Sequence, residues 1–299
     1  MRVMFDEVKG NKVKSLLLVS IFIIVIGLLG AIMGLTFGNL FIGLFLAVLF
    51  SVVYSLICYY SGDSMILSLS GAKPVTKKDY PYLFHTVEGL SIAANLKHIP
   101  KAYVIEDSAM NAFATGRDAE HASIAVTTGL LKSMNRQELD GVVAHEMAHI
   151  RNYDIRFMML TAVLVGIVTL LSDFLLRSFL WRRHSDSRNT NQFTILLIVV
   201  GLLFAVLSPI IGKMIQLAIS RKREFMADAS AAVLTRYPSG LASALMKISK
   251  DPDPLVDRAN RSTAHLFIST PFRKDKDFIT GLFATHPPIH ERIKRLEEM

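Results

Sequence analysis

One stretch decides the fold of this chain: Val142-Val143-Ala144-His145-Glu146-Met147-Ala148-His149. Two histidines four residues apart lie on one face of a helix, so both imidazoles can reach one zinc ion. Glu146 projects near the same position and can take a proton from a water that such an ion activates. The HExxH pattern therefore predicts a hydrolytic centre that holds one Zn²⁺ per chain, with His145 and His149 as ligands and Glu146 as the catalytic base.

The residues around the motif predict where its helix begins and ends. Asn135 followed by Glu138 resembles a capping box, in which each side chain binds the backbone N–H of the other residue. Leu139 and Val142 begin the buried face. We expect the helix to continue through residues 151–154 towards an apolar segment, which places the metal site within a few turns of a bilayer.

The composition indicates a membrane protein. Hydrophobic residues make up 52% of the 299 residues, and the mean hydropathy of +0.40 is too high for an ordinary soluble domain. No charged residue occurs between Lys14 and Asp63. Because one helical crossing takes about 20 residues, this stretch is long enough to span a bilayer twice, at residues 15–34 and 40–60.

A second apolar pair follows the motif, at residues 157–172 and 193–212. The first of these is short, and a buried core helix or a re-entrant helix is an alternative to a membrane span. With both counted, the chain is a polytopic membrane protein with four transmembrane helices. Two crossings or none leave the residues after Arg221 on the same side of the membrane as His145.

Basic residues predict the orientation. Lys9, Lys12 and Lys14 precede the first span, and the positive-inside rule places them in the cytoplasm. Two crossings then return the chain, so the active site of this multi-pass protein faces the cytoplasmic side of the cell membrane. Residues 177–188, between the third and fourth spans, should then lie outside the cell, yet they hold four arginines. Either the positive-inside rule fails at this loop, or the second apolar pair does not fully cross the membrane.

Charge and cysteine content exclude other classes. The net charge is +8, but the basic residues crowd the ends of the apolar segments, which indicates the lipid bilayer and not nucleic acid as the partner. The single cysteine, Cys58, excludes a disulfide framework and a cysteine zinc site. The first two spans hold no charged residue, which disfavours a channel or transporter.

The rest of the sequence predicts an α+β fold, predominantly α, in which a small β-sheet belongs to a zincin-like protease domain. Strands are expected at residues 102–105, 110–115 and 123–127, the last two forming a hairpin. Helices are expected at residues 83–96, 220–235, 241–249 and 288–298, with Pro238 and Gly240 breaking the second from the third. The expected domains are a first membrane hairpin (1–62), the first part of the protease domain (63–156), a second membrane hairpin (157–212) and the second part of the protease domain (213–299).

A catalytic zinc site needs a third protein ligand, and no further histidine follows at the metzincin spacing. Glu224 lies on a predicted helix that returns to the same membrane face, so we expect it to be that ligand. Asp228, one turn later, is placed to accept an N–H bond from a ligand histidine. The alternative is that Glu224 only pairs with nearby basic residues or lipid headgroups.

The chain resembles the HtpX-type membrane metalloproteases, which are relatives of the type 1 CAAX prenyl proteases. The resemblance covers essentially the whole chain and rests on the motif at His145–His149, the membrane hairpin, Arg223-Glu224-Phe225-Met226-Ala227-Asp228 and Thr285-His286-Pro287-Pro288. It implies a gluzincin, in which Glu224 is the third zinc ligand and Glu146 the general base.

The resemblance also implies roles for residues outside the motif. An edge strand with Asn111, Ala112, Phe113 and Ala114 would pair with extended substrate. His286 would stabilise the oxyanion of the tetrahedral intermediate, Asp228 would support a ligand histidine, and Arg292 would hold the site together.

Together these features predict a membrane-embedded zinc endopeptidase that cleaves misfolded or damaged membrane proteins in quality control and stress response. Binding by strand addition tolerates many sequences, which suits that role. The resemblance implies self-cleavage as well. The nearest alternative is a CAAX-type prenyl endoprotease, although that fold has more than four spans. A non-catalytic membrane scaffold is a further alternative, although the HExxH motif is intact.

Overall fold

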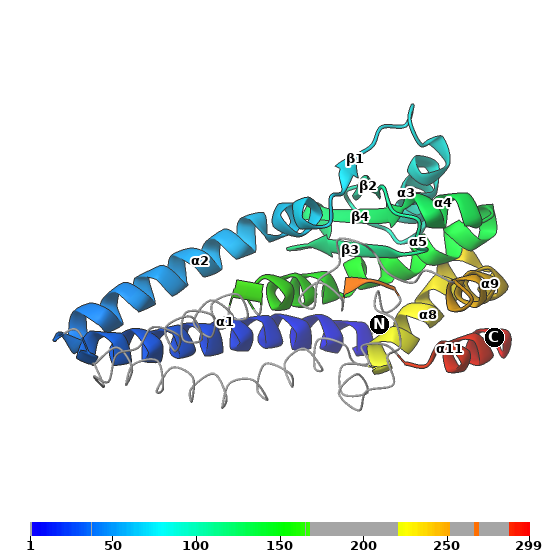
Figure 1. Cartoon of the computed structure of the whole chain (residues 1–299). Helices are drawn as coiled ribbons and strands as arrows, with labels where there is room; N and C mark the ends of the chain where they lie inside the picture. The colour runs from blue at the N-terminus through cyan, green and yellow to red at the C-terminus, as the bar shows by residue number, and fades with distance from the viewer. Residues whose placement is uncertain (1, 37, 165, 168–220, 252–265, 269–286) are drawn as a thin grey trace, which may run out of the picture.

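Two long helices and a mixed α/β body make up the computed structural model, which describes residues 2–36, 38–164, 166–167, 221–251, 266–268 and 287–299. Helices α1 (Arg2–Thr36) and α2 (Leu40–Leu69) form an antiparallel hairpin. The body lies at the end of this hairpin where α1 begins and α2 ends (Figure 1).

The hairpin predicted from the apolar run is confirmed, and glycines let its helices touch. Gly38 takes a φ of +95° in the turn, and the Asn39 side chain accepts a backbone hydrogen bond that caps α2. A Cβ atom added at Gly43 would overlap with the backbone of Gly30 and Gly34 on α1. The backbones of α1 and α2 are therefore so close at these three glycines that no side chain fits between them.

Both helices are long and apolar enough to cross a membrane, at Lys9–Ile32 of α1 and Leu40–Leu69 of α2. At about 1.5 Å per residue, the 30 residues of α2 extend about 45 Å, which exceeds the bilayer core of about 30 Å. Buried Ile66 and Leu67 pack the last turns of α2 on the body, which explains why the helix continues past its predicted end at residue 60.

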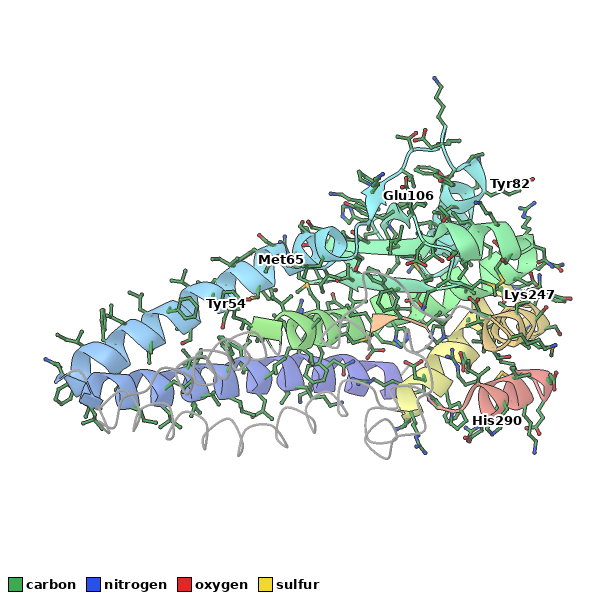
Figure 2. All side chains as sticks on the ribbon, viewed as in Figure 1. Tyr54, Met65, Tyr82, Glu106, Lys247 and His290 are labelled. Atoms are coloured by element: carbon green, nitrogen blue, oxygen red, sulfur yellow. The ribbon has the colours of Figure 1, made fainter. Side chains whose placement is uncertain are left out.

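Large apolar side chains along α2 are exposed. Phe41, Phe45 and Phe50 expose 79%, 66% and 52% of their surface, and Figure 2 shows side chains standing out from this helix on both sides of Tyr54. Exposed apolar surface of this extent indicates contact with lipid or with a partner. The outer face of α2 is therefore suited to a membrane.

Of the later apolar pair, residues 193–212, 165 and 168–172 lie outside the described residues. Residues 154–164 and 166–167 are helical, and the side chains at 157–164 are buried. They share one apolar cluster with Leu18 and Phe22 of α1 and with Cys58 of α2. The described part of this segment is thus a buried helix beside the hairpin.

A four-stranded mixed sheet lies in the body, in the order β1-β2-β4-β3. Its strands are β1 (Lys73–Pro74), β2 (Lys101–Ile105), β3 (Ala112–Gly116) and β4 (Ala122–Thr127). β3 and β4 form the predicted antiparallel hairpin, whereas β2 runs parallel to β4. The sheet order makes β3 an edge strand. The two residues of β1 and the short helix α4 (Thr128–Ser133) were not predicted, because neither is long enough to show a periodic pattern.

Helix α5 (Arg136–Arg151) carries the HExxH motif through the middle of the body. It packs against β3, α3 (Pro81–Ala93), α8 (Arg221–Thr235) and α9 (Pro238–Ser249). The predicted capping box is confirmed, since Asn135 and Glu138 bind each other's backbone N–H groups. Glu138 also accepts hydrogen bonds from Ser243 and Lys247 of α9, the latter labelled in Figure 2. The motif is therefore held on a helix fixed at its start and packed on several sides.

The prediction that this helix continues through residues 151–154 is wrong. Asn152 and Tyr153 form a turn, in which Tyr153 has a φ of +59°, and helical structure resumes at Asp154. A residue with positive φ cannot continue a right-handed helix. The turn changes the direction of the chain directly after the motif.

The predicted break between helices α8 and α9 is confirmed, because α8 ends at Thr235 and α9 begins at Pro238, but the second helix begins three residues before its predicted start at residue 241. Proline is tolerated at the first helical position, where its missing N–H would have no partner within the helix. A Cβ atom added at Gly240 would lie 2.6 Å from the carbonyl oxygen of Gln137, so the glycine permits close packing of α9 on α5. The last helix, α11 (Ile289–Glu297), is close to its prediction.

Candidate metal centre

Helix α5 places His145 and His149 one turn apart on a single face, and both are buried. Their Nε2 atoms are 3.2 Å apart. Two atoms bound at about 2.0–2.1 Å to one tetrahedral zinc ion lie about 3.3 Å from each other. The two imidazoles therefore have the separation that a shared zinc ion requires.

Glu224 reaches the same point from α8. Its Oε2 is 3.7 Å from Nε2 of His145, and its Oε1 is 3.5 Å from Nε2 of His149. One ligand atom from each of the three residues lies within 4.8 Å of the others. Two histidines and one glutamate are a donor set that catalytic zinc sites use. Because Glu224 is only 4% exposed, it is not a partner for lipid headgroups, and the three residues fit a zinc ion.

Asp228 orients His145, and Arg292 holds Asp228. The Asp228 Oδ1 atom is 2.9 Å from Nδ1 of His145, so Nε2 is the nitrogen that faces the centre. Arg292 of α11 donates from Nε and Nη2 to the two Asp228 oxygens, at 2.8 and 2.7 Å. Burial raises the pKa of Asp228, but the charge of Arg292 and the hydrogen bonds from His145 and Arg292 together outweigh burial and lower it to about 2. The carboxylate therefore stays ionised as an acceptor for His145.

Asp154 orients His149, and sequence reasoning missed it. Its Oδ2 atom is 3.0 Å from Nδ1 of His149. Burial lowers the pKa of His149, but the hydrogen bond to Asp154 and the negative charges of Glu224, Asp154 and Glu146 together outweigh burial and raise it to about 9. Asp154 comes five positions after His149, which is the wrong spacing for one face of a continuous helix. Only the turn at Asn152 and Tyr153 brings Asp154 back to the motif, and the sequence carried no signal for that turn.

Glu146 is buried beside the two ligand histidines, with 2% of its surface exposed. Burial and the charge of Glu224 raise its pKa, while His149 and a backbone hydrogen bond from Ala114 lower it, and the result is about 7. A general base acts best when its pKa is near the working pH. The carboxylate is therefore suited to accept and return a proton near neutral pH.

The outer edge of β3 runs beside the motif. Ala114 on this edge bonds to Glu146, and two residues earlier the Ala112 carbonyl accepts a hydrogen bond from the backbone N–H of Ile268, at 2.9 Å. Asn111 lies just before the strand, and its carbonyl accepts from Thr127 of β4. Of the four residues predicted for the edge strand, Ala112, Phe113 and Ala114 thus lie in β3 and Asn111 flanks it.

Residues 266–268 lie along this edge, drawn in orange in Figure 1. The Phe267 ring packs against Phe113 with centroids 5.1 Å apart, and Arg292 Nη1 donates to the Ile268 carbonyl at 3.2 Å. At most 2% of each of the three residues is exposed. A segment of the chain therefore contacts both the edge strand and the arginine behind the metal ligands. Sequence reasoning gave no role to this segment. The predicted site residue His286 lies outside the described residues.

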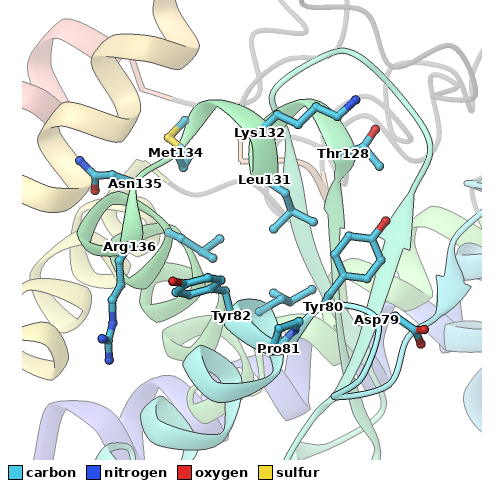
Figure 3. Close-up of a pocket in the computed structure, with 12 residues that line it drawn as sticks. Asp79, Tyr80, Pro81, Tyr82, Thr128, Leu131, Lys132, Met134, Asn135 and Arg136 are labelled. Carbon is cyan, nitrogen blue, oxygen red and sulfur yellow. The ribbon is translucent and has the colours of Figure 1, made fainter.

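A separate hollow of about 560 Å³ opens at the start of α5, between the start of α3 and α4 (Figure 3). Tyr80 and Tyr82 line it together with Lys132 and Arg136. None of its lining residues belongs to the cluster around His145, so the hollow is distinct from the candidate metal centre.

A HExxH helix, a glutamate from a second helix and a carboxylate behind each histidine define the site of a metallopeptidase. Together with the two apolar helices of spanning length, this site indicates the class of membrane metalloproteases. The family model for peptidase family M48 matches residues 77–299, and the chain belongs to that family.

Individual relatives support the HtpX-type resemblance. A "Protease HtpX homolog" from Dictyoglomus turgidum is 47% identical over 241 residues, which are 81% of this chain and 77% of that protein. One from Tropheryma whipplei is 42% identical over 296 residues, which are 99% of this chain and 98% of that protein. The crystal structure of S. mikatae Ste24p shares the fold, with a TM-score of 0.53 and 20% identity over 98% of this chain and 67% of that chain.

Proposed function

We propose that the chain is a zinc-dependent endopeptidase that cleaves misfolded or damaged membrane proteins close to the bilayer. The observation that carries the proposal is the buried cluster of His145, His149 and Glu224, whose ligand atoms have the separations of a zinc site. Glu146 is buried between this cluster and β3, where a catalytic base is needed.

The proposed chemistry assigns one task to each group. When bound, zinc would polarise both the scissile carbonyl and the attacking water. Glu146 accepts the proton of that water and then delivers it to the leaving amine. Asp228 and Asp154 keep the Nδ1 atoms of the two histidines engaged, so that Nε2 of each faces the centre. His286, by its resemblance to the family motif, would stabilise the oxyanion.

The outer edge of β3 is the proposed substrate-binding strand, with Asn111 flanking it. An extended peptide can add to an exposed edge through backbone hydrogen bonds, which gives affinity with little sequence preference. The bond from Ile268 to Ala112 supports this, because it engages a backbone group on that edge beside Glu146. A substrate that pairs with β3 would replace residues 266–268 there.

The proposed setting is a multi-pass protein of the cell membrane with four spans and the active site on the cytoplasmic side. The hairpin of α1 and α2 supports a membrane location, and Lys9, Lys12 and Lys14 support the orientation. Substrates would be unfolded or damaged membrane proteins, in a quality-control and stress-response role, and the protease would also cut itself.

The experiment that tests this proposal is cleavage in proteoliposomes by the wild type and by Glu146→Gln. Substrates should be a destabilised membrane protein, its stable parent, a soluble unfolded protein and a prenylated peptide. We expect zinc-dependent cleavage of the destabilised membrane protein by the wild type alone. Preference for the prenylated peptide would favour a CAAX-type prenyl endoprotease, and equal cleavage by Glu146→Gln would favour a scaffold with a contaminating protease.

A further inference from the structure

The first membrane helix contributes a buried amide close to the metal centre. Asn11 lies near the start of the candidate span of α1, yet only 1% of its surface is exposed. Its Nδ2 donates to Asp154 Oδ1 at 2.6 Å and to the Asn152 carbonyl at 3.1 Å. Its Oδ1 accepts from Arg223 Nη1 at 3.1 Å. Both N–H groups and the carbonyl of this amide are therefore bonded to residues from later parts of the chain.

These bonds lead directly to a metal ligand. Asp154 uses its two carboxylate oxygens for different partners. Oδ1 accepts the hydrogen bond from Asn11, and Oδ2 lies 3.0 Å from Nδ1 of His149. A carboxylate that holds the distal nitrogen of a ligand histidine fixes the orientation of the ring and raises its basicity. Because Asn11 fixes one oxygen of that carboxylate, it also limits how the other oxygen can meet His149.

The same amide joins the two helices that supply the ligands. On one side it holds Asn152 and Asp154, which follow directly after α5. On the other side it bonds to Arg223, the residue before the ligand Glu224 on α8. Two groups contact Asp154 Oδ1 from this side: Asn11 Nδ2 at 2.6 Å and Arg223 Nε at 3.8 Å. The contact with Asn11 is the shorter of the two.

A neighbouring contact fixes α1 at the same place. The Lys12 ammonium lies 5.0 Å from the centroid of the Tyr153 ring, in the turn between the motif and Asp154. A cation over an aromatic face is a favourable contact. Consecutive residues of α1 therefore contact the turn that brings Asp154 to His149.

We propose that Asn11 is a positioning residue of the metal centre, which holds Asp154 against His149 and thereby makes the first membrane helix part of the zinc site. The proposal rests on the proposed zinc function. A buried amide on an apolar helix is costly unless it is hydrogen-bonded, and here its bonds go to the residues that orient and flank the ligands. Metal affinity would then depend on correct seating of α1.

The test uses the full-length chain in detergent, in an inactive Glu146→Gln background that prevents self-cleavage. Zinc affinity is measured by competition with a chelator, and the visible spectrum of the Co²⁺-loaded protein reports on the ligand field. Asn11→Asp keeps the shape and removes the donors, while Asn11→Leu removes all polar contacts. Ser15→Ala is the matched control, because Ser15 is also buried on α1 and bonds only to the Asn11 carbonyl among the contacts described.

For both Asn11 variants we expect about tenfold weaker zinc binding, the lower end of the range for residues that hold metal ligands, and an altered Co²⁺ spectrum. For Ser15→Ala we expect zinc affinity to change by less than about twofold. A double-mutant cycle with Asp154→Asn separates positioning from general structure. If Asn11 acts through Asp154, Asn11→Leu should weaken zinc binding by less than about twofold once Asp154 is changed.

Two results would overturn the proposal. One is an unchanged zinc affinity in both Asn11 variants while Glu224→Ala loses zinc, which would leave the proposed zinc centre intact. The other is an equal loss with and without Asp154→Asn, which would indicate a general loss of folding. A starting protein that binds no zinc would contradict the proposed function as well, so the two failures are distinguishable.

Discussion

The buried pair of Arg292 and Asp228 gives the sharpest mutational prediction. No surface of Arg292 is exposed, and it donates two parallel hydrogen bonds to Asp228, which in turn contacts His145. Removing one partner of a buried ion pair costs about 3–5 kcal/mol, because the remaining charge has no compensation. We therefore expect Arg292→Ala to lower the free energy of unfolding by about that amount.

Arg292→Lys should have a smaller effect in the same direction. A lysine ammonium cannot make the two parallel bonds of a guanidinium, so at least one charge-assisted bond is lost, at about 1.5–3 kcal/mol. Because Asp228 would also orient His145 less well, zinc affinity should fall about 10–100-fold in Arg292→Ala, which corresponds to about 1.4–2.7 kcal/mol.

The assay is thermal unfolding in detergent with zinc and with a chelator, together with zinc competition. Lys294→Ala is the control on the same helix, because Lys294 is exposed and its ion pair with Glu298, at 3.9 Å, should contribute under about 1 kcal/mol. Wild-type unfolding temperature and zinc affinity in Arg292→Ala would refute the reasoning.

Three further changes test the packing around the site. Glu138→Ala removes the capping box of α5 and the bonds to Ser243 and Lys247, so the free energy of unfolding should fall by about 1–3 kcal/mol, and an unchanged unfolding temperature would contradict this. Gly43→Leu places a side chain where α1 and α2 cross, so we expect lower yield and faster proteolysis of the hairpin than for the exposed change Leu46→Ala. Phe267→Ala loosens residues 266–268 from β3, so cleavage of a short peptide should rise at least about threefold, whereas lost activity would assign that segment a supporting role.

The sequence predicted the parts of the site that share one helix or one short motif. The spacing of His145 and His149, the capping box at Asn135 and the position of Asp228 one turn after Glu224 are all local patterns, and the structure places them accordingly. The hairpin of α1 and α2 followed from an uncharged run with glycines, for the same reason.

Contacts between distant residues were not predictable in this way. Asp154 reaches His149 only because Tyr153 adopts a positive φ, and Asn11 bonds to Asp154 although they lie 143 positions apart in the sequence. Residues 266–268 show no strand pattern, so nothing indicated that Ile268 would bond to β3. Each of these contacts depends on how helices and turns pack in three dimensions, which residue periodicity does not encode.

The most direct test of the zinc centre is the metal content of three proteins purified side by side, together with their cleavage of casein. We predict about one zinc per chain in the wild type and in Glu146→Gln, little zinc in Glu224→Ala, and cleavage by the wild type alone. Full zinc occupancy in Glu224→Ala would remove Glu224 from the ligand set, and cleavage by Glu146→Gln at the wild-type rate would contradict the role of Glu146 as the base.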